Sequence, residues 1–192
     1  MGTRPAILVD TNIIIEAVRV GAWERLRAHE NLVTVRRCCD EALSGIPGAP
    51  GRVPVTEAHL APPLSVVTVT GDESVYVAIL HPDLATLDAG ERELLTHAFT
   101  RRRSAEGGAE AGGMGAALRA AGLPVKDGSA AFQIACADQA AVRVAISMGL
   151  GDLVVSLEEI LKAAGVRVEG RLKGHYMRRT LTAWKTKHAL GI

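Results

Sequence analysis

The chain has 192 residues, 48% of them hydrophobic and 22% charged, and its formal net charge is +1, which excludes a disordered chain and a strongly basic polyanion-binding protein. Aromatic residues make up only 3%, so the core must be aliphatic and nucleic-acid binding by base stacking is disfavoured. The three cysteines lack metal-ligand spacing, and there is neither a leader-like start nor an apolar run of about 18 residues. We therefore expect one cytoplasmic globular domain without disulfides, zinc or contact with a membrane.

The predicted elements alternate between strands and helices. In chain order we expect strands at 5–9, 32–35, 64–69, 131–137 and 153–155. The helices between them are expected at 12–29 with a break near Gly21, then at 38–43, 74–80, 88–99, 139–148 and 157–164. This alternation predicts an α/β fold with a central, mostly parallel sheet of about five strands.

Three segments interrupt the alternation. The stretch 45–63 is rich in Gly and Pro and predicts a loop, with a helical turn within 53–60. Residues 101–130 are rich in Gly and Ala and predict a surface insertion, with a helix at 114–121. From 166 to 192 the chain carries seven basic residues against Glu169, so we expect a basic tail, helical at 177–189, after a domain that spans 1–165.

Acidic residues follow two of the predicted strands. Asp10 comes after strand 5–9 and Asp138 after strand 131–137, and each precedes a helix. The carboxyl ends of parallel strands meet at one edge of a sheet, where ligands bind, so both side chains are expected at that edge. Each is also a good N-cap for its helix, which is the structural alternative.

Two further acids are expected to approach the same edge from helices. Asp88 begins Asp88-Ala89-Gly90-Glu91, which has the spacing of a capping box. Gly90 costs about 1 kcal/mol in a helical turn relative to Ala, so a close backbone approach to a ligand would explain it. Glu41 follows the second strand and competes with its neighbour Asp40.

Two other aspartates complete the comparison. Asp72 follows the third strand and is the strongest rival, whereas Asp152 precedes the fifth strand and belongs at the opposite edge. Several carboxylates close together repel one another, and a divalent cation relieves that repulsion. An all-oxygen ligand set suits Mg²⁺ or Mn²⁺, which serve phosphodiester chemistry. The candidate metal and catalytic residues are thus Asp10, Glu41, Asp88 and Asp138.

These acids occur in short motifs, which in chain order are Val9-Asp10-Thr11-Asn12, Glu41, Leu87-Asp88-Ala89-Gly90-Glu91 and Cys136-Ala137-Asp138. This order resembles the PIN-domain family, in the branch related to VapC toxins. The resemblance implies a three-layer α/β/α fold and a Mg²⁺- or Mn²⁺-dependent endoribonuclease that cleaves single-stranded RNA through a metal-activated water. It also implies an antitoxin protein as partner and a homodimer, with Thr11 supporting the metal site. The insertion at 101–130 departs from the family, whose connection there is usually short.

The residues expected to bind the RNA substrate are Thr11, Asn12, Arg36 and Arg37. The cluster Arg101 to Arg103 is a further candidate for binding phosphates, although solvated surface is the commoner role of such charges.

Two alternatives stay open. One is a catalytically silent module of the same fold that binds RNA or a protein partner through its basic tail. The other is a phosphatase or receiver-like domain in which Asp10 accepts a phosphoryl group beside Lys126 or Ser156. The six histidines share no ligand spacing, and no phosphate-binding glycine motif is present.

Overall fold

The computed structural model describes residues 5–44, 53–107, 132–168 and 170–192. Its sheet has five parallel strands in the order β3-β2-β1-β4-β5. Their bounds are β1 (Ala6–Val9), β2 (Asn31–Val35), β3 (Ser65–Val67), β4 (Phe132–Ala135) and β5 (Val154–Val155). The central strand β1 is buried along its whole length, because it pairs with β2 on one side and with β4 on the other.

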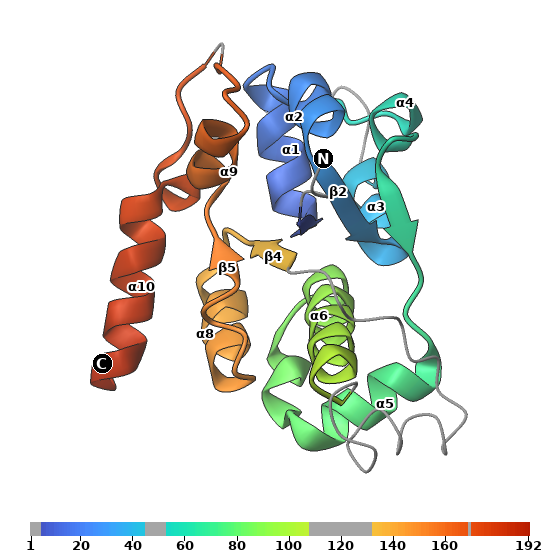
Figure 1. The fold of residues 1–192 in the computed structure, drawn as a ribbon, viewed down its shortest axis with the longest axis vertical. Helices are drawn as coiled ribbons and strands as arrows, with labels where there is room; N and C mark the ends of the chain where they lie inside the picture. The colour runs from blue at the N-terminus through green and yellow to red at the C-terminus, as the bar shows by residue number, and fades with distance from the viewer. Residues whose placement is uncertain (1–4, 45–52, 108–131, 169) are drawn as a thin grey trace.

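Helices cover both faces of the sheet, as Figure 1 shows. The α-helices are α1 (Thr11–Arg19), α2 (Trp23–His29), α3 (Arg36–Leu43), α4 (Glu57–Leu60), α5 (Gly71–Leu80), α6 (Ala89–Gly107), α8 (Gln139–Ser147), α9 (Leu157–Ala163) and α10 (Arg178–Leu190). Two 3-10 turns, η1 (Pro82–Thr86) and η2 (Gly174–Tyr176), precede α6 and α10. None of the helices in the described ranges has the length and apolarity needed to span a membrane.

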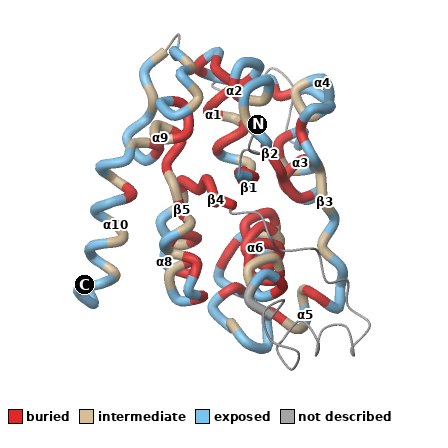
Figure 2. The backbone as a smooth tube through the Cα atoms, viewed as in Figure 1, coloured by how far each residue is buried: buried red, intermediate tan, exposed pale blue. Residues whose placement is uncertain are grey.

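Alternate residues of β1 point into two separate cores. Ala6 and Leu8 pack with α5, α6 and α8, whereas Ile7 and Val9 pack with α1, α2 and α9. This period of two is the pattern of a strand buried on both faces. In Figure 2 the residues coloured as buried include β4 and much of α6, where the sheet meets a helix layer. The structure thereby confirms the predicted three-layer α/β/α fold with a parallel sheet.

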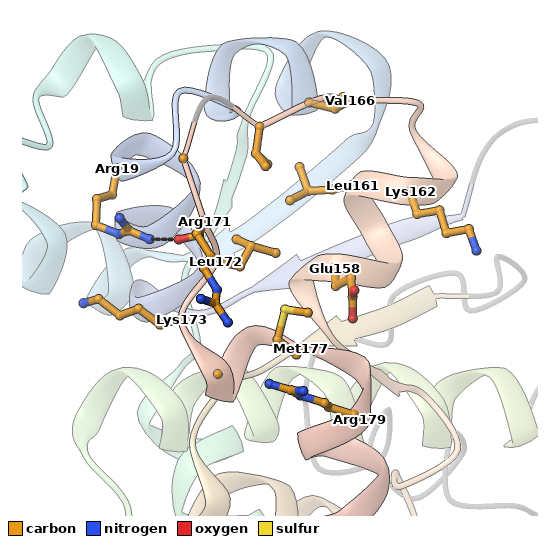
Figure 3. A pocket seen from close by; sticks show the side chains of 13 residues that line it. Arg19, Glu158, Leu161, Lys162, Val166, Arg171, Leu172, Lys173, Met177 and Arg179 are labelled. Atoms are coloured by element: carbon orange, nitrogen blue, oxygen red, sulfur yellow. Dashed lines mark hydrogen bonds between the residues drawn. The ribbon is translucent and has the colours of Figure 1, made fainter.

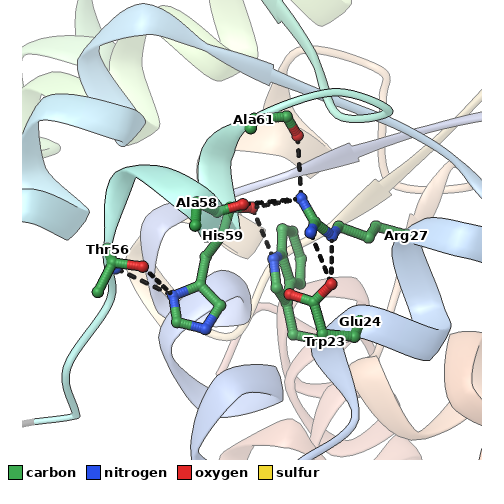
Figure 4. Close-up of polar contacts among 7 residues, drawn as sticks. All are labelled: Trp23, Glu24, Arg27, Thr56, Ala58, His59 and Ala61. Atoms are coloured by element: carbon green, nitrogen blue, oxygen red, sulfur yellow. Dashed lines mark hydrogen bonds and ion pairs between the residues drawn. The ribbon is translucent and has the colours of Figure 1, made fainter.

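Most element positions agree with the sequence prediction, and the break in the first helix is a clear example. The chain turns at Gly21, whose φ of 65° lies in the left-handed region, and α2 then begins at Trp23. The helical turn expected within 53–60 is α4, which is tied to α2. The indole of Trp23 donates to the carbonyl of His59 at 2.8 Å, and Arg27 donates to the carbonyls of Ala58 and Ala61 (Figure 4).

One boundary was wrong. Residues 101–107 were expected in the insertion, but they continue α6 to Gly107. Their arginines contact the folded domain: Arg101 lies over the ring of Phe132 and Arg102 pairs with Asp152 at 2.8 Å. These tertiary contacts extend the helix beyond the point that the local pattern indicates. The helix expected at 114–121 and the residue Lys126 lie outside the described residues.

The C-terminal tail packs against the domain. After α9 the chain crosses to α1, forms η2, and then runs as α10 beside α8 (Figure 1). Leu181 of α10 is buried in the core that α8 shares, and Lys185 donates to the carbonyl of Val154 at 2.7 Å. The expected tail helix is therefore present and packs against α8, on the side of the edge strand β5.

Candidate functional site

Asp10 and Asp138 lie where neighbouring strands end. Val9 of β1 is paired with Ala135 of β4, so the residues that follow both strands emerge side by side. The backbone N–H of Asp10 donates to the carbonyl of Ala135 at 3.4 Å, which continues the pairing by one residue. The topology therefore brings both acids to the carboxyl edge of the sheet.

Three of the predicted acids begin helices. Asp10 Oδ1 accepts the N–H of Ile13 at 2.7 Å at the start of α1. Asp138 Oδ1 accepts the N–H groups of Ala140 and Ala141 at 2.7 and 3.1 Å at the start of α8. Asp88 Oδ1 accepts the N–H of Glu91 at 2.8 Å in the first turn of α6. Each carboxylate thus serves as a cap through one oxygen, which explains its position without excluding a second role for the other oxygen.

Asp10 is the most perturbed of these acids. It is 1% exposed, and its Oδ2 is buried without a hydrogen-bond partner among the described residues. Burial raises the pKa of Asp10 to about 7, and the charge on Asp88 adds to the rise, while the hydrogen bond from Ile13 and the weaker polar interactions of the Cys136 thiol and the Ala137 backbone oppose it. A buried carboxylate oxygen without a donor is the kind of atom that a cation would satisfy.

Glu91 joins the acids at this edge. Burial is the main reason why the pKa of Glu91 is raised to about 8, and repulsion from Asp88, Asp138 and Asp10 raises it further. The carboxyls of these four residues therefore lie in one electrostatic neighbourhood. From the sequence alone, Glu91 is interpreted only as part of a capping box. The signal that would have found it is its position three residues after Asp88, on the same side of the helix.

Glu41 occupies a different position from the other acids. Its Oε2 accepts the hydroxyl of Thr11 at 2.9 Å, its Oε1 accepts the N–H of Gly90 at 2.9 Å, and the Nε of Arg37 is 3.8 Å from Oε1. It thereby links α3 to the starts of α1 and α6. The hydroxyl of Thr11 helps to hold the Glu41 carboxylate in this position.

The close approach expected at Gly90 is made by this carboxylate. A Cβ at position 90 would overlap Oε2 of Glu41 and lie 2.9 Å from its Cδ. Gly90 is therefore explained by a contact within the protein, not by the ligand that the sequence analysis had invoked.

The remaining predicted residues lie at the rim. Asn12 is exposed and its carbonyl accepts the hydroxyl of Tyr176 at 3.2 Å. Arg36 is exposed and borders a small pocket with Glu57 and Leu60, whereas Arg37 is exposed beside Glu41. A pocket of about 350 Å³ adjoins Asp138 and is lined by Gln139, Ala140 and Arg143. Arg143 is thus a cation beside the acids that the sequence analysis did not single out.

The rival acids lie elsewhere or serve structural roles. Asp40 is exposed, and Asp72 is exposed in the first turn of α5. Asp152 precedes β5 and pairs with Arg102, so both this acid and the Arg101 to Arg103 cluster lie toward the opposite edge of the sheet. The hydroxyl of Ser156 donates to Glu159 at 2.8 Å within the capping box of α9. Neither Asp72 nor the arginine cluster is therefore placed with the carboxylates.

The side chains do not form a finished ligand cage. Within the described ranges, no three or more His, Cys, Asp or Glu side chains are arranged so that they could hold a metal ion. These carboxyl groups nevertheless fit a divalent cation. A cation would pair with the buried Oδ2 of Asp10, which has no partner among the described residues, and would stabilise the charged forms of Asp10 and Glu91, whose pKa values are raised. Comparisons with family models, with curated proteins and with solved structures found no match.

Proposed function

We propose that this protein is a Mg²⁺- or Mn²⁺-dependent endoribonuclease that cleaves single-stranded RNA. The observation that carries the proposal is the gathering of Asp10, Asp88, Asp138 and Glu91 at the carboxyl edge, with one buried oxygen of Asp10 unpartnered. Metal-dependent phosphodiester hydrolysis requires such a set of oxygen ligands. The sequence resemblance to PIN domains supports the choice of RNA, and adds an antitoxin as partner.

In this proposal Asp10, Asp88, Asp138 and Glu91 would hold the cation, which would supply an ionised water and stabilise the charge on the phosphate oxygens. The chain contributes rigidity and charge. The helix N–H groups fix one oxygen of each aspartate, and Glu41 holds the starts of α1 and α6 in place. Arg143 and Arg37 lie beside Asp138 and Glu41, where they would orient phosphates of the RNA.

Glu91 has a separate role before the cation arrives. With a pKa of about 8 it holds a proton on its carboxyl group at neutral pH, which lowers the repulsion among its neighbours. Binding of a cation would displace that proton, so metal affinity is expected to rise with pH between about 6 and 8.

The test is RNA cleavage in Mn²⁺ by the wild type and by Asp10→Asn and Asp138→Asn. The amide oxygen of Asn still accepts the helix N–H, so both variants should stay folded while they lose at least about a hundredfold in rate. Asp72→Asn is the matched control, since Asp72 is exposed in α5. A second readout is the increase in unfolding temperature on adding Mn²⁺, which Asp10→Asn should abolish. Cleavage that survives EDTA, or an unchanged Asp10→Asn enzyme, would refute the proposal.

The basic tail supports a second candidate, a catalytically silent module that binds RNA. Arg167, Arg178, Arg179 and Lys187 are exposed, and both oxygens of Glu41 are occupied within the protein. This function predicts salt-sensitive RNA binding without metal, weakened by Arg178→Glu and Lys187→Glu. Binding that is unchanged in those variants argues against it.

A further inference from the structure

A separate pocket of about 820 Å³ lies where the C-terminal segment meets α9 and α1. Its interior is aliphatic and is formed by Leu161, Val166, Val168, Leu172 and Met177. Figure 3 shows Leu161, Leu172 and Met177 of this set between α9, the segment 170–174 and the start of α10. None of the described acids of the carboxyl edge lines this pocket, so it is a distinct feature of the molecule.

The walls are held in place by polar contacts to α1. The buried Glu16 pairs with Arg19 at 2.6 Å and also accepts the N–H of Lys173 at 3.0 Å. Arg19 in turn donates to the carbonyl of Arg171 at 2.8 Å, as the dashed line in Figure 3 marks. The segment that closes one side is therefore fixed in the protein as it stands, and the pocket is preformed.

The rim is positively charged. Among the described residues that line the opening, four are exposed cations besides Arg19, which is paired with Glu16, and one is an acid; the four cations are Lys162, Arg171, Lys173 and Arg179, and the acid is Glu158. Glu158 already accepts the N–H of Arg178 at 2.8 Å. Four exposed cations above an aliphatic floor complement a ligand that has an apolar body and a negative head.

The lining also argues against other ligands. Its described lining residues include no aromatic, amide or hydroxyl side chain, so they offer no platform for stacking a base and no group that reads a base edge. Leu, Val and Met adapt to an alkyl chain, and Met177 in particular has a flexible, polarisable side chain. The volume falls within the range of small-molecule sites, which is roughly 300–1,000 Å³.

We propose that this pocket binds an anionic amphiphile, a single aliphatic chain that ends in a carboxylate. The chain would lie against Leu161, Leu172 and Met177, and the carboxylate would meet the rim cations. The inference does not depend on the ribonuclease proposal, because it uses different residues.

The experiment is calorimetric titration of the full chain with dodecanoate below its micelle concentration. We expect saturable binding of one molecule, which weakens with added salt. Dodecyltrimethylammonium and butyrate should each bind at least about tenfold more weakly. The first has the opposite head charge and cannot pair with the rim cations, and the second lacks the long alkyl chain that would be buried against the aliphatic side chains.

Two variants and two matched controls locate the binding. Val168→Glu places a carboxylate in the pocket and Arg171→Glu reverses a rim charge; each should weaken dodecanoate binding at least about tenfold. Val75→Glu and Arg25→Glu make the same changes at exposed positions on α5 and α2 and should leave it unchanged. Val75 and Val168 are both exposed, at 61% and 38%, so these glutamates are not expected to unfold the chain.

Several results would overturn the proposal. They are equal binding of dodecanoate by the pocket variants and the controls, equal binding of the cationic amphiphile, and binding to anionic lipid vesicles without binding to the free carboxylate. Binding of an acidic, leucine-rich peptide in place of dodecanoate would make the pocket a peptide site, which also refutes the assignment.

Discussion

At the scale of single residues, Asp10 combines two demands on one carboxyl group. Its Oδ1 caps α1 through the N–H of Ile13, which favours a polar side chain at this position. Its Oδ2 is buried without a partner, which makes the charged form costly. A cap needs only one oxygen, so replacing Asp10 by Asn keeps the cap of α1 and removes the buried charge.

Asp10→Asn should therefore stabilise the metal-free protein above neutral pH. The folded-state pKa of about 7 lies above the ordinary 3.8, so the favourable contribution of this group is complete below about pH 4 and is lost as the pH rises to 7. In EDTA at pH 8 the variant should be more stable by about 2 kcal/mol, and near pH 4 the two should be similar. Urea unfolding at both pH values measures this. Equal stability at pH 8 would show that Asp10 is not strained by its charge.

Gly90 and Glu41 form a second residue-scale pair. Ala at position 90 should gain up to about 1 kcal/mol of helix propensity, but its Cβ would displace the Glu41 carboxylate from Thr11 and from the N–H at 90. In Glu41→Ala the obstacle is gone, so Gly90→Ala should become stabilising by about 0.5–1 kcal/mol. A double-mutant cycle by urea unfolding measures the coupling. Additive effects would mean that Glu41 moves aside without cost.

At the scale of elements, an aspartate follows each of β1 and β4 and begins the next helix. Asp138→Ala removes the acceptor for the N–H groups of Ala140 and Ala141 and should cost about 1 kcal/mol, whereas Asp138→Asn should cost a few tenths. Urea unfolding separates them. If both variants lose RNA cleavage while only the alanine loses stability, the carboxylate charge acts beyond the cap. A cleavage loss that follows stability would make Asp138 a cap alone.

The elements also show what the sequence could predict. The strands, the break at Gly21 and the acids after β1 and β4 depend on local pattern and on the geometry of parallel sheets, so they were predictable. Glu91 was predictable only in part: its spacing from Asp88 is local, but its closeness to Asp10 and Asp138 depends on how α6 packs against the sheet. The extension of α6 depends on Phe132 and Asp152, which are also distant in sequence. Glu41 was predicted as a metal ligand from its position after the second strand and from the resemblance; its hydrogen bonds to Thr11 and Gly90, which the local pattern does not indicate, also make it a link between helices.

At the scale of the whole molecule, the described residues include two kinds of charge network. At the carboxyl edge, burial raises the pKa values of Asp10 and Glu91 and so favours their protonated forms. On the face of α1, Glu16 is buried too, but it is paired with Arg19 and with the N–H of Lys173. Burial alone would raise its pKa; the hydrogen bonds and charges of these partners outweigh that effect, so the pKa of Glu16 is lowered. The two networks therefore respond to pH in opposite directions.

This difference predicts how the C-terminal tail is held. Because the pKa of Glu16 is lowered, its contribution is present above its ordinary pKa of 4.5 and is lost as the pH falls below it. Glu16→Gln should cost about 1–3 kcal/mol at pH 7 and less near pH 4, and it should speed hydrogen exchange at Lys173. Urea unfolding and exchange measured by NMR test both parts. Glu24→Gln is the matched control, since Glu24 also pairs with an arginine three residues later but is 60% exposed. An equal loss in the control, or unchanged exchange at Lys173, would show that the tail is held by α10 on α8 alone.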